Sequence, residues 1–438
     1  MEKTKPSVLL ISIDALKPEF VLESEKFGIK LPNLRKYFVE NGTYASKGVK
    51  SVFPTFTYTC HQSIITGTHP ATHGTHTNKL FDPEGKHQDA WFWYVSDKVP
   101  TLWECAKENG YISATVAFPT SVAAKADFNI PEFWRDGSAL DSKLINAVSC
   151  PQGIVKEVEK EIGQMPGGLD LTLDGDRRRF KAAMWVLENK VKPEVKKEDK
   201  PFFMSTYFAS YDETAHEVGV HGEAAFVALQ EIDSFVGELM EKAHEISNDN
   251  VVVCVVSDHG TINNVGDIRP NTLLYKNGLI KTNENGNIID WEAWCQRSGG
   301  VGQIKLKDPT NEAVQAKVKA LLKELIEDKN NGIAEIITGK DAAAKRKGFP
   351  DADYVLISKP GYEVREDLLG EYFNPEPTQK AQHGYDEELP DMRASFYIEG
   401  VNIAKNKDIG ELHLIDIAPT LAHIMGIDMP TAEGKNVL

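Results

Sequence analysis

The sequence predicts an α/β protein with a doubly wound, mostly parallel sheet flanked by helices. Four apolar runs rich in β-branched residues have the length and composition of buried strands: residues 8–13, 111–118, 202–209 and 250–256. Helical patterns lie between these runs, for example at residues 101–109 and 223–244. Strands that alternate with helices along a chain are typical of a sheet with helices on both faces.

Acidic and histidine residues directly follow three of these strands. The carboxyl ends of the strands are the edge where open α/β sheets place their chemistry. The first strand ends at Asp14, the strand at 202–209 leads into YDETAH, and the strand at 250–256 leads into SDHG. We therefore expect five potential ligands at one edge of the sheet: Asp14, Asp212, His216, Asp258 and His259.

A second, smaller unit is predicted at residues 268–375. Its pattern differs from the rest, with an amphipathic helix at 311–328, a short apolar run at 354–358 and many Lys and Gly residues. The strand and helix patterns resume at 394–399 and 415–425. We expect a core of residues 1–267 and 376–438 with an inserted α+β cap.

Charge excludes one class of partner. The 438-residue chain has 65 acidic and 49 basic residues and a formal net charge of -16, so most of its surface would repel a nucleic-acid polymer. A small anionic substrate can still bind where metal ions reverse the local field. The charge balance thus leaves a small anionic molecule as the expected partner.

The five cysteines are odd in number and form no CxxC pair, which predicts reduced thiols. The N-terminal apolar run is too short for a signal peptide, and no stretch approaches the ~20 apolar residues of a membrane span. We expect a cytoplasmic protein with no membrane partner, and the sequence leaves its oligomeric state open.

Five separated segments together predict a metal site. The segments already named are joined by SVFPTFTYTCHQSIITG, which contains Thr57, and by QHGYD, which contains His383. Each segment alone is weak evidence, because a strand-ending Asp caps the next helix more often than it binds metal. Mixed Asp and His ligands at strand ends favour zinc or manganese.

The order of ID, PTFT, DETAH, SDHG and QHGYD resembles the nucleotide pyrophosphatase/phosphodiesterase family of the alkaline phosphatase superfamily. The resemblance covers nearly the whole chain and implies an alkaline phosphatase-like fold with two divalent ions, zinc or alternatively manganese. It assigns one ion to Asp14, Thr57, Asp258 and His259. It assigns the other ion to Asp212, His216 and His383.

The resemblance also implies that Thr57 is the nucleophile of a covalent phosphothreonine mechanism, because the family pattern P-T-x-T-aromatic selects it over Thr55 and Thr59. A threonine hydroxyl attacks phosphorus only when its pKa is lowered, and a bound dication does this while screening the incoming anion. Three ligand carboxylates and two dications leave one positive charge, which favours a phosphoryl group.

Two further residues take substrate-binding roles from the resemblance. Asn78, in HGTHTN, occupies the position of an amide that donates to a phosphoryl oxygen. Tyr58 follows the nucleophile, where the family has an aromatic residue that stacks on a nucleobase, and core packing is the alternative. The aromatic run at 91–94 could form a second wall, but packing is the stronger interpretation.

The chain departs from the family at Thr59-Cys60, where the family commonly has Pro-Asn, and this affects the shape of the pocket. Nine other histidines lack a strand-end acidic partner or a family ligand position, and we assign none to metal: His61, His69, His73, His76, His87, His221, His244, His413 and His423.

Phosphodiester or nucleotide pyrophosphate hydrolysis is the activity that these residues favour. A phosphonate hydrolase of the phosphonoacetate type, or a phosphomonoester hydrolase, would use the same chemistry with a different pocket. A catalytically inactive binding module is the alternative of another class, and retention of all six Asp and His ligands argues against it. A sulfatase is disfavoured because the C-x-P-x-R pattern is absent.

Overall fold

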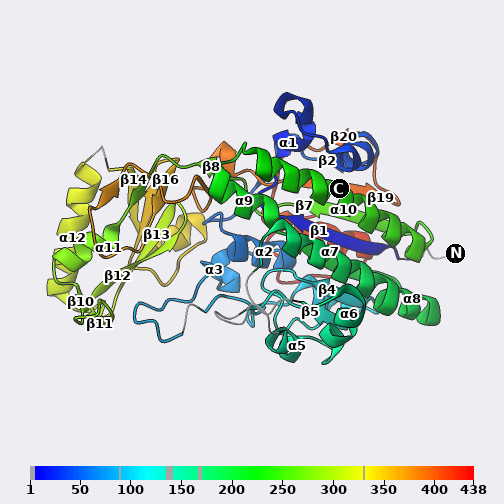
Figure 1. The fold of residues 1–438 in the computed structure, drawn as a ribbon, viewed down its shortest axis with the longest axis horizontal. Coiled ribbons are helices and arrows are strands. Elements are labelled where there is room, and N and C mark those ends of the chain that lie inside the picture. Colours follow the sequence, from blue (N-terminus) through cyan, green and yellow to red (C-terminus); the bar gives the residue numbers. More distant parts are fainter. Residues whose placement is uncertain (1–4, 88–89, 135–141, 166–169, 329–330) are drawn as a thin grey trace.

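The computed structural model describes residues 5–87, 90–134, 142–165, 170–328 and 331–438. Its largest sheet has eight strands in the order β20-β2-β19-β7-β1-β6-β4-β5 (Figure 1). The strands from β7 to β5 are parallel, and β19 is antiparallel to β7. This confirms the predicted α/β class with a mostly parallel sheet.

The strands of this sheet are β1 (Ser7–Ile13), β2 (Thr43–Tyr44), β4 (Ile112–Val116), β5 (Phe128–Ile130), β6 (Phe202–Phe208), β7 (Val251–Val256), β19 (Phe396–Gly400) and β20 (Lys407–Asp408). The helices are α1 (Pro18–Leu22), α2 (Thr57–Thr66), α3 (Pro70–His73), α4 (Leu102–Glu108), α5 (Lys143–Val148), α6 (Ile154–Ile162), α7 (Leu173–Val186), α8 (Lys192–Glu198), α9 (Ser210–Val218), α10 (Glu223–Ser247), α11 (Pro270–Lys276), α12 (Glu312–Glu327), α13 (Gly339–Asp341) and α14 (Ile417–Met425).

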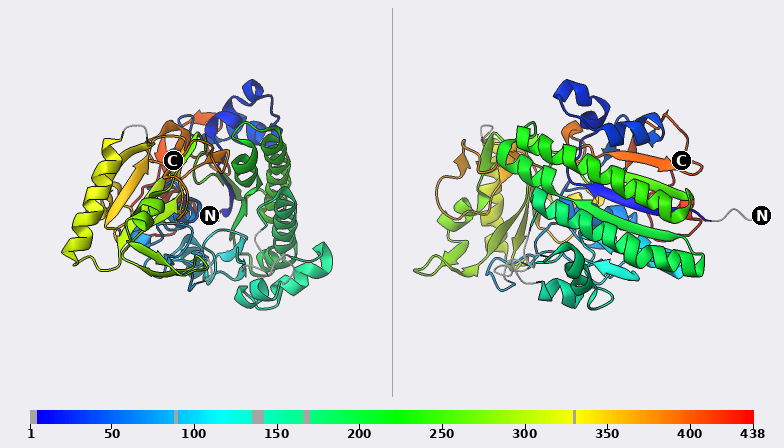
Figure 2. Two further views of the ribbon diagram at one scale, coloured as in Figure 1. Left: turned by 60° about the vertical axis from the view of Figure 1, so that its left-hand side comes forward. Right: turned by 45° about the vertical axis from the view of Figure 1, so that its right-hand side comes forward.

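Strand β1 lies in the middle of the core and is buried on both faces. Leu9 and Ile11 belong to the apolar cluster that includes residues of α7 and α10, whereas Val8 and Leu10 belong to the cluster that includes residues of α2, α4 and α14. Figure 2 shows the long green helices α7 and α10 side by side over one face of the sheet. Successive side chains of a strand point to opposite faces, so a continuous apolar run fits this position.

The four strands predicted from apolar runs all form, as β1, β4, β6 and β7. The predicted helix at 415–425 begins two residues later, at Ile417, because Leu414–Asp416 forms a 3₁₀ turn. The short strands β2, β5 and β20 lack an apolar run of their own, and pairing with a neighbouring strand defines them.

Residues 268–375, which we call the cap, contain a four-stranded antiparallel sheet in the order β12-β13-β15-β14. Its strands are β12 (Ala293–Ser298), β13 (Val301–Leu306), β14 (Ile333–Thr338) and β15 (Tyr354–Ser358). Helix α12 packs on it, and Val318 and Leu356 share an apolar cluster there (Figure 1). The division of the chain at 268 and 375 stays a prediction.

Smaller sheets lie in the core, in the cap and at the boundary between them. One has the order β16-β9-β17, and the others pair β10 with β11, β18 with β8 and β21 with β3. Their bounds are β3 (Val49–Lys50), β8 (Ile262–Asn263), β9 (Gly266–Ile268), β10 (Ile280–Thr282), β11 (Ile288–Trp291), β16 (Tyr362–Val364), β17 (Phe373–Asn374), β18 (Ala381–Gln382) and β21 (Leu412–His413). Within the described residues, none of the helices has the length and apolar character that a membrane span requires.

The turn between β12 and β13 packs directly against the segment that contains His383. The Gly300 backbone N–H donates to the His383 carbonyl oxygen at 3.0 Å. A Cβ atom on Gly299 would lie 1.9 Å from the same oxygen. Only glycine fits such a close approach, and Gly299 also has a φ of +66°. The cap is therefore in backbone contact with a predicted metal ligand.

We predict that Gly299→Ala destabilises the protein far more than Gly278→Ala. Gly278 has a similar φ of +70°, but a Cβ atom there would meet no other atom within 4 Å, so this variant isolates the backbone strain. That strain should cost about 1 kcal/mol in both variants, and the clash at Gly299 about 1 to 3 kcal/mol more. Thermal unfolding measures the difference, and equal losses would show that the turn does not depend on this contact.

Candidate active site

Two neighbouring parallel strands bring the first three predicted ligands together. Asp14 follows β1, and Asp258 and His259 come just after β7, which pairs with β1. Asp258 Oδ2 lies 2.9 Å from His259 Nε2, and Asp14 Oδ1 lies 3.5 Å from the same nitrogen. The parallel pairing of β1 and β7 thus converts two distant sequence motifs into one cluster.

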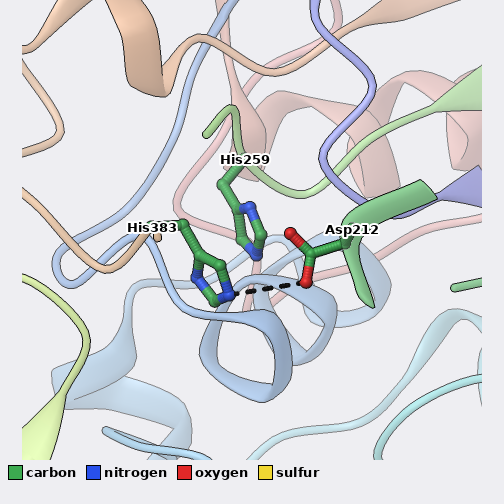
Figure 3. Close-up of side chains that lie close together, drawn as sticks. All are labelled: Asp212, His259 and His383. Carbon is green, nitrogen blue, oxygen red and sulfur yellow. Dashed lines mark ion pairs between the residues drawn. The ribbon is translucent and has the colours of Figure 1, made fainter. Parts of the chain in front are cut away.

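Helix α9 follows β6 and supplies two more ligands. Asp212 and His216 are one turn apart, with Asp212 Oδ2 at 3.0 Å from His216 Nε2. His383 comes directly after β18, and its Nε2 lies 3.7 Å from the same carboxylate oxygen. Figure 3 shows Asp212, His259 and His383 converging, and the rings of His259 and His383 are stacked with centroids 3.8 Å apart.

The six Asp and His residues predicted as ligands form one constellation. Two groups have ligand atoms within 4.8 Å of one another: Asp212, His259 and His383, and Asp14, Asp258 and His259. The sequence placed His259 in one set, whereas in the structure it lies within reach of both groups. His216 extends the first group through Asp212. These distances fit two adjacent ion positions.

The three histidines present the same ring nitrogen to the site. His216 Nδ1 lies 2.7 Å from the Ala381 carbonyl oxygen, His259 Nδ1 lies 3.0 Å from that of Gly260, and His383 Nδ1 lies 3.2 Å from that of Thr55. A ring that donates through Nδ1–H keeps a lone pair on Nε2. Metal-binding histidines typically hold their second nitrogen in this way.

Three buried carboxylate oxygens in the site have no hydrogen-bond partner: Asp14 Oδ1, Asp212 Oδ1 and Asp258 Oδ2. A buried carboxylate oxygen that accepts no hydrogen bond is costly, and a bound cation would remove that cost. The donor set of carboxylate oxygens and imidazole nitrogens suits zinc or manganese. The residues therefore fit a pair of divalent ions.

Charge crowding is evident in the pKa values. Burial, reinforced by the nearby Asp258 carboxylate, raises the pKa of Asp14 well above its usual range. Burial opposes ionisation of Asp212 as well, but His216 and His383 outweigh it and lower the pKa of that carboxyl. Burial together with the neighbouring His259 lowers the pKa of His383 to about 3. Like charges held this close shift one another's pKa values, and bound cations would relieve the repulsion.

Thr57 is the first residue of helix α2, and its Oγ1 lies 3.3 Å from His259 Nε2. Thr55 instead donates its hydroxyl to the Tyr385 carbonyl, and Thr59 is fully buried. Of the three threonine hydroxyl groups in this turn, that of Thr57 lies beside a predicted ligand, whereas Thr55 meets His383 only through its backbone carbonyl. The position of Thr57 at a helix N-terminus also favours an anion bound beside it.

Asn78 lies beside the turn that contains Thr57. Its Oδ1 accepts the backbone N–H of Tyr58 at 2.9 Å, which fixes the amide and leaves its NH₂ group as the donor. Asn78 lines a cleft together with Asp14, Thr57, Asp212 and His383. The cap also contributes to this cleft, through Arg297 and Glu366.

Tyr58 is 2% exposed, and its hydroxyl donates to Glu132 Oε2 at 2.7 Å. Its ring packs against Trp91 and Trp134, with centroids 5.5 and 6.4 Å away. All four side chains line the cleft, so Trp91 is the member of the aromatic run at 91–94 that reaches it. Nucleobase stacking on Tyr58 stays a prediction.

Sequence reasoning missed a buried network behind helix α9. Asp176 accepts the backbone N–H groups of Ala209 and Ser210 at 3.0 and 2.8 Å, so it caps the helix that carries Asp212. Arg179 pairs with Asp176 at 3.0 Å and lies 3.8 Å from Glu132. Burial, opposed by Arg179, raises the pKa of Glu132 to about 7. Because Glu132 also accepts the hydroxyl of Tyr58, the network connects helix α9 to the segment that contains Thr57.

Two further buried residues, Tyr207 and His61, contact Asp14 and the backbone of Thr57. The Tyr207 hydroxyl donates to Asp14 Oδ2. His61, which we did not assign to metal, is fully buried with Nδ1 2.8 Å from the Thr57 carbonyl and Nε2 2.8 Å from Ser12 Oγ. Its neighbour Cys60 is also fully buried, against Ser51. No local pattern marks these residues, because each acts on a partner from another segment.

Residues 8–386 match the family model of type I phosphodiesterase / nucleotide pyrophosphatase. The chain belongs to this family. It is 26% identical over 265 residues to human ectonucleotide pyrophosphatase/phosphodiesterase family member 1, a match that covers 58% of this chain and 23% of the relative. It is 22% identical over 429 residues to bis(5'-adenosyl)-triphosphatase ENPP4 of Pongo abelii, covering 96% of this chain and 78% of the relative.

Solved structures of the family share the fold. Murine ectonucleotide pyrophosphatase/phosphodiesterase 5 superposes with a TM-score of 0.67 at 16% identity, covering 98% of this chain and 97% of that one. The same murine protein is also known as an inactive threonine-to-alanine variant in complex with AMP, with the same TM-score. The predicted fold family is thereby confirmed.

We predict that Asp176→Asn lowers the free energy of unfolding by about 2 to 4 kcal/mol, because it leaves Arg179 without its buried partner and removes the anion at the start of α9. Asp174→Asn is the matched control on the same helix, since its pair with Arg177 is exposed and worth at most about 1 kcal/mol. Denaturant titration measures both. Similar losses in the two variants would mean that Asp176 does not cap α9.

Proposed function

We propose that this chain is a metal-dependent hydrolase that cleaves phosphodiester or nucleotide pyrophosphate bonds through a covalent intermediate on Thr57. The observation that carries the proposal is the position of Thr57 Oγ1, 3.3 Å from His259 within a cluster of three buried carboxylates and three histidines. Family membership supports hydrolysis of this bond class.

The ligand sets follow the sequence assignment. One ion would be held by Asp14, Thr57, Asp258 and His259, and the other by Asp212, His216 and His383. When bound, the two ions would lower the pKa of the Thr57 hydroxyl and neutralise charge on the phosphoryl group. Zinc is the proposed ion, with manganese as the alternative, because both accept this mixed donor set.

In the proposed reaction, Thr57 is the nucleophile and Asn78 binds the phosphoryl group. Thr57 Oγ1 forms a bond to phosphorus as the bond to the leaving-group oxygen breaks, and its proton is lost to solvent. The Asn78 amide donates to a phosphoryl oxygen, a contact whose loss typically costs ~10²-fold in rate. Water then cleaves the phosphothreonine, which restores the Thr57 hydroxyl and releases the phosphorylated product.

The relatives support a nucleotide as the substrate. The Pongo abelii relative is named for its action on bis(5'-adenosyl) triphosphate, and the murine structure holds AMP in a threonine-to-alanine variant that is inactive. The matched region spans about a quarter of the length of the family member 1 relatives, so activity and substrate are proposals for this chain.

We predict that Thr57→Ala lowers turnover of a nucleotide ester by several powers of ten while the protein stays folded, because the covalent step is removed. Thr59→Ala is the matched control, two residues further along α2 and outside the cleft lining. Acid quenching followed by peptide mass spectrometry should find phosphate on Thr57 in the wild type. Full activity of folded Thr57→Ala would refute the mechanism, and phosphate on Thr55 would move the nucleophile.

We predict about two transition-metal ions per chain and the loss of one of them in His383→Ala. His244→Ala is the control, because His244 pairs with Asp249 and Glu399 away from the cleft. Elemental analysis of the folded variants gives the stoichiometry. A folded wild type that contains no metal, and that added zinc or manganese does not activate, would contradict the assignment and leave the inactive binding module as the better interpretation.

A further inference from the structure

Two cationic side chains line the cleft besides the predicted metal ligands: Lys79, which follows Asn78, and Arg297, from strand β12 of the cap. We propose that Arg297, together with Lys79, binds a second anionic group of the substrate, separate from the phosphoryl group that reacts. This inference rests on the proposed function and narrows its substrate class.

Lys79 and Arg297 come from distant parts of the chain, and a contact between their segments brings both side chains to the cleft. Gln296 Nε2 donates to the carbonyl oxygens of Lys79 and Leu80 at 3.1 and 3.0 Å. Gln296 is 4% exposed, so this contact is shielded from water. Arg297 is the next residue, and its side chain points to the other face of the strand. Gln296 therefore holds the segment that contains Lys79 against strand β12, and the next residue, Arg297, lines the cleft.

Arg297 is also fixed relative to the metal ligands. It precedes Gly299 by two residues, and the Gly299–Gly300 turn packs on the His383 backbone through the 3.0 Å hydrogen bond described above. Its own backbone N–H donates to Glu366 Oε1 at 2.9 Å. The guanidinium is therefore presented from a rigid strand, which suits recognition better than a loop.

Arg297 keeps N–H donors for an incoming anion in addition to the one that pairs with Glu363. The fully buried carboxylate of Glu363 accepts from Arg297 at 3.1 Å and from Arg365 at 3.4 Å. Arg365 also pairs with Asp367 at 3.4 Å, and Glu366 lines the cleft beside Arg297. The attraction for an anion therefore depends on the N–H donors of Arg297 that Glu363 does not accept and on Lys79. The Arg297 side chain is 34% exposed, and a guanidinium has five N–H donors in a planar fork. That geometry matches a phosphate or a carboxylate.

The substrate class follows from this chemistry. A phosphoanhydride carries further phosphate groups, and a phosphonate such as phosphonoacetate carries a carboxylate, so both offer the second anion. A simple phosphodiester with a neutral leaving group has only the reacting phosphoryl group. Arg297 should therefore favour doubly anionic substrates over the single-anion diester.

The test compares ATP, phosphonoacetate and the p-nitrophenyl ester of thymidine 5'-monophosphate on the full chain loaded with zinc. In Arg297→Gln, kcat/KM for the preferred doubly anionic substrate should fall about tenfold or more relative to that for the p-nitrophenyl ester, mainly through KM, as expected for the loss of a charged hydrogen bond. A fall confined to ATP identifies a phosphate as the second anion, and one confined to phosphonoacetate identifies a carboxylate. Arg297→Lys should restore part of the ratio.

Arg365→Gln is the matched control, because Arg365 shares the Glu363 carboxylate but does not line the cleft. An unchanged substrate ratio in Arg297→Gln, or an equal fall in Arg365→Gln, would overturn the inference. If the wild type hydrolyses none of the three compounds, the proposed function fails instead. Calorimetric binding of ATP and of phosphonoacetate to zinc-loaded Thr57→Ala, with and without Arg297→Gln, then decides the inference alone, and unchanged affinity for both compounds would reject it.

Discussion

The crowding of three buried carboxylates at the carboxyl edge of the parallel sheet is the constraint on which the site depends. Strands β6, β1 and β7 are neighbours, so the residues that follow them, Asp212, Asp14 and Asp258, cannot separate. Each carries an oxygen without a hydrogen-bond partner. The neighbouring histidines compensate part of this charge, and the pair of cations that we propose would compensate the rest.

The surrounding structure holds this crowded cluster from two sides. Behind α9, the buried Asp176–Arg179 pair caps the helix that carries Asp212 and His216. In front, the Gly299–Gly300 turn of the cap packs on the backbone of His383. A rigid support is expected where ligands must be held close to a productive geometry, because small displacements weaken binding and catalysis.

This arrangement places one hairpin of the cap at both the ligand cluster and the cleft. The contact between Gly300 and His383 joins the hairpin to the ligand cluster, while Arg297 on the adjoining strand lines the cleft. Substrate selection and ligand positioning therefore share one hairpin, and substitutions near its turn should affect both properties.

The sequence alone determined the α/β class and the central strands, and with the family resemblance it predicted the six ligands and Thr57, an assignment that stays a prediction. Most of these depend on a local signal: a buried strand is a continuous apolar run, Asp14, Asp258 and His259 lie within three residues of a strand end, and a short family motif marks Thr57. Tertiary structure alone decided that His259 lies within reach of both ligand groups, that Asp176 caps α9 and that Arg297 enters the cleft. These contacts join segments far apart in the chain, and a side chain that acts through another element leaves no periodic or motif signal in its own.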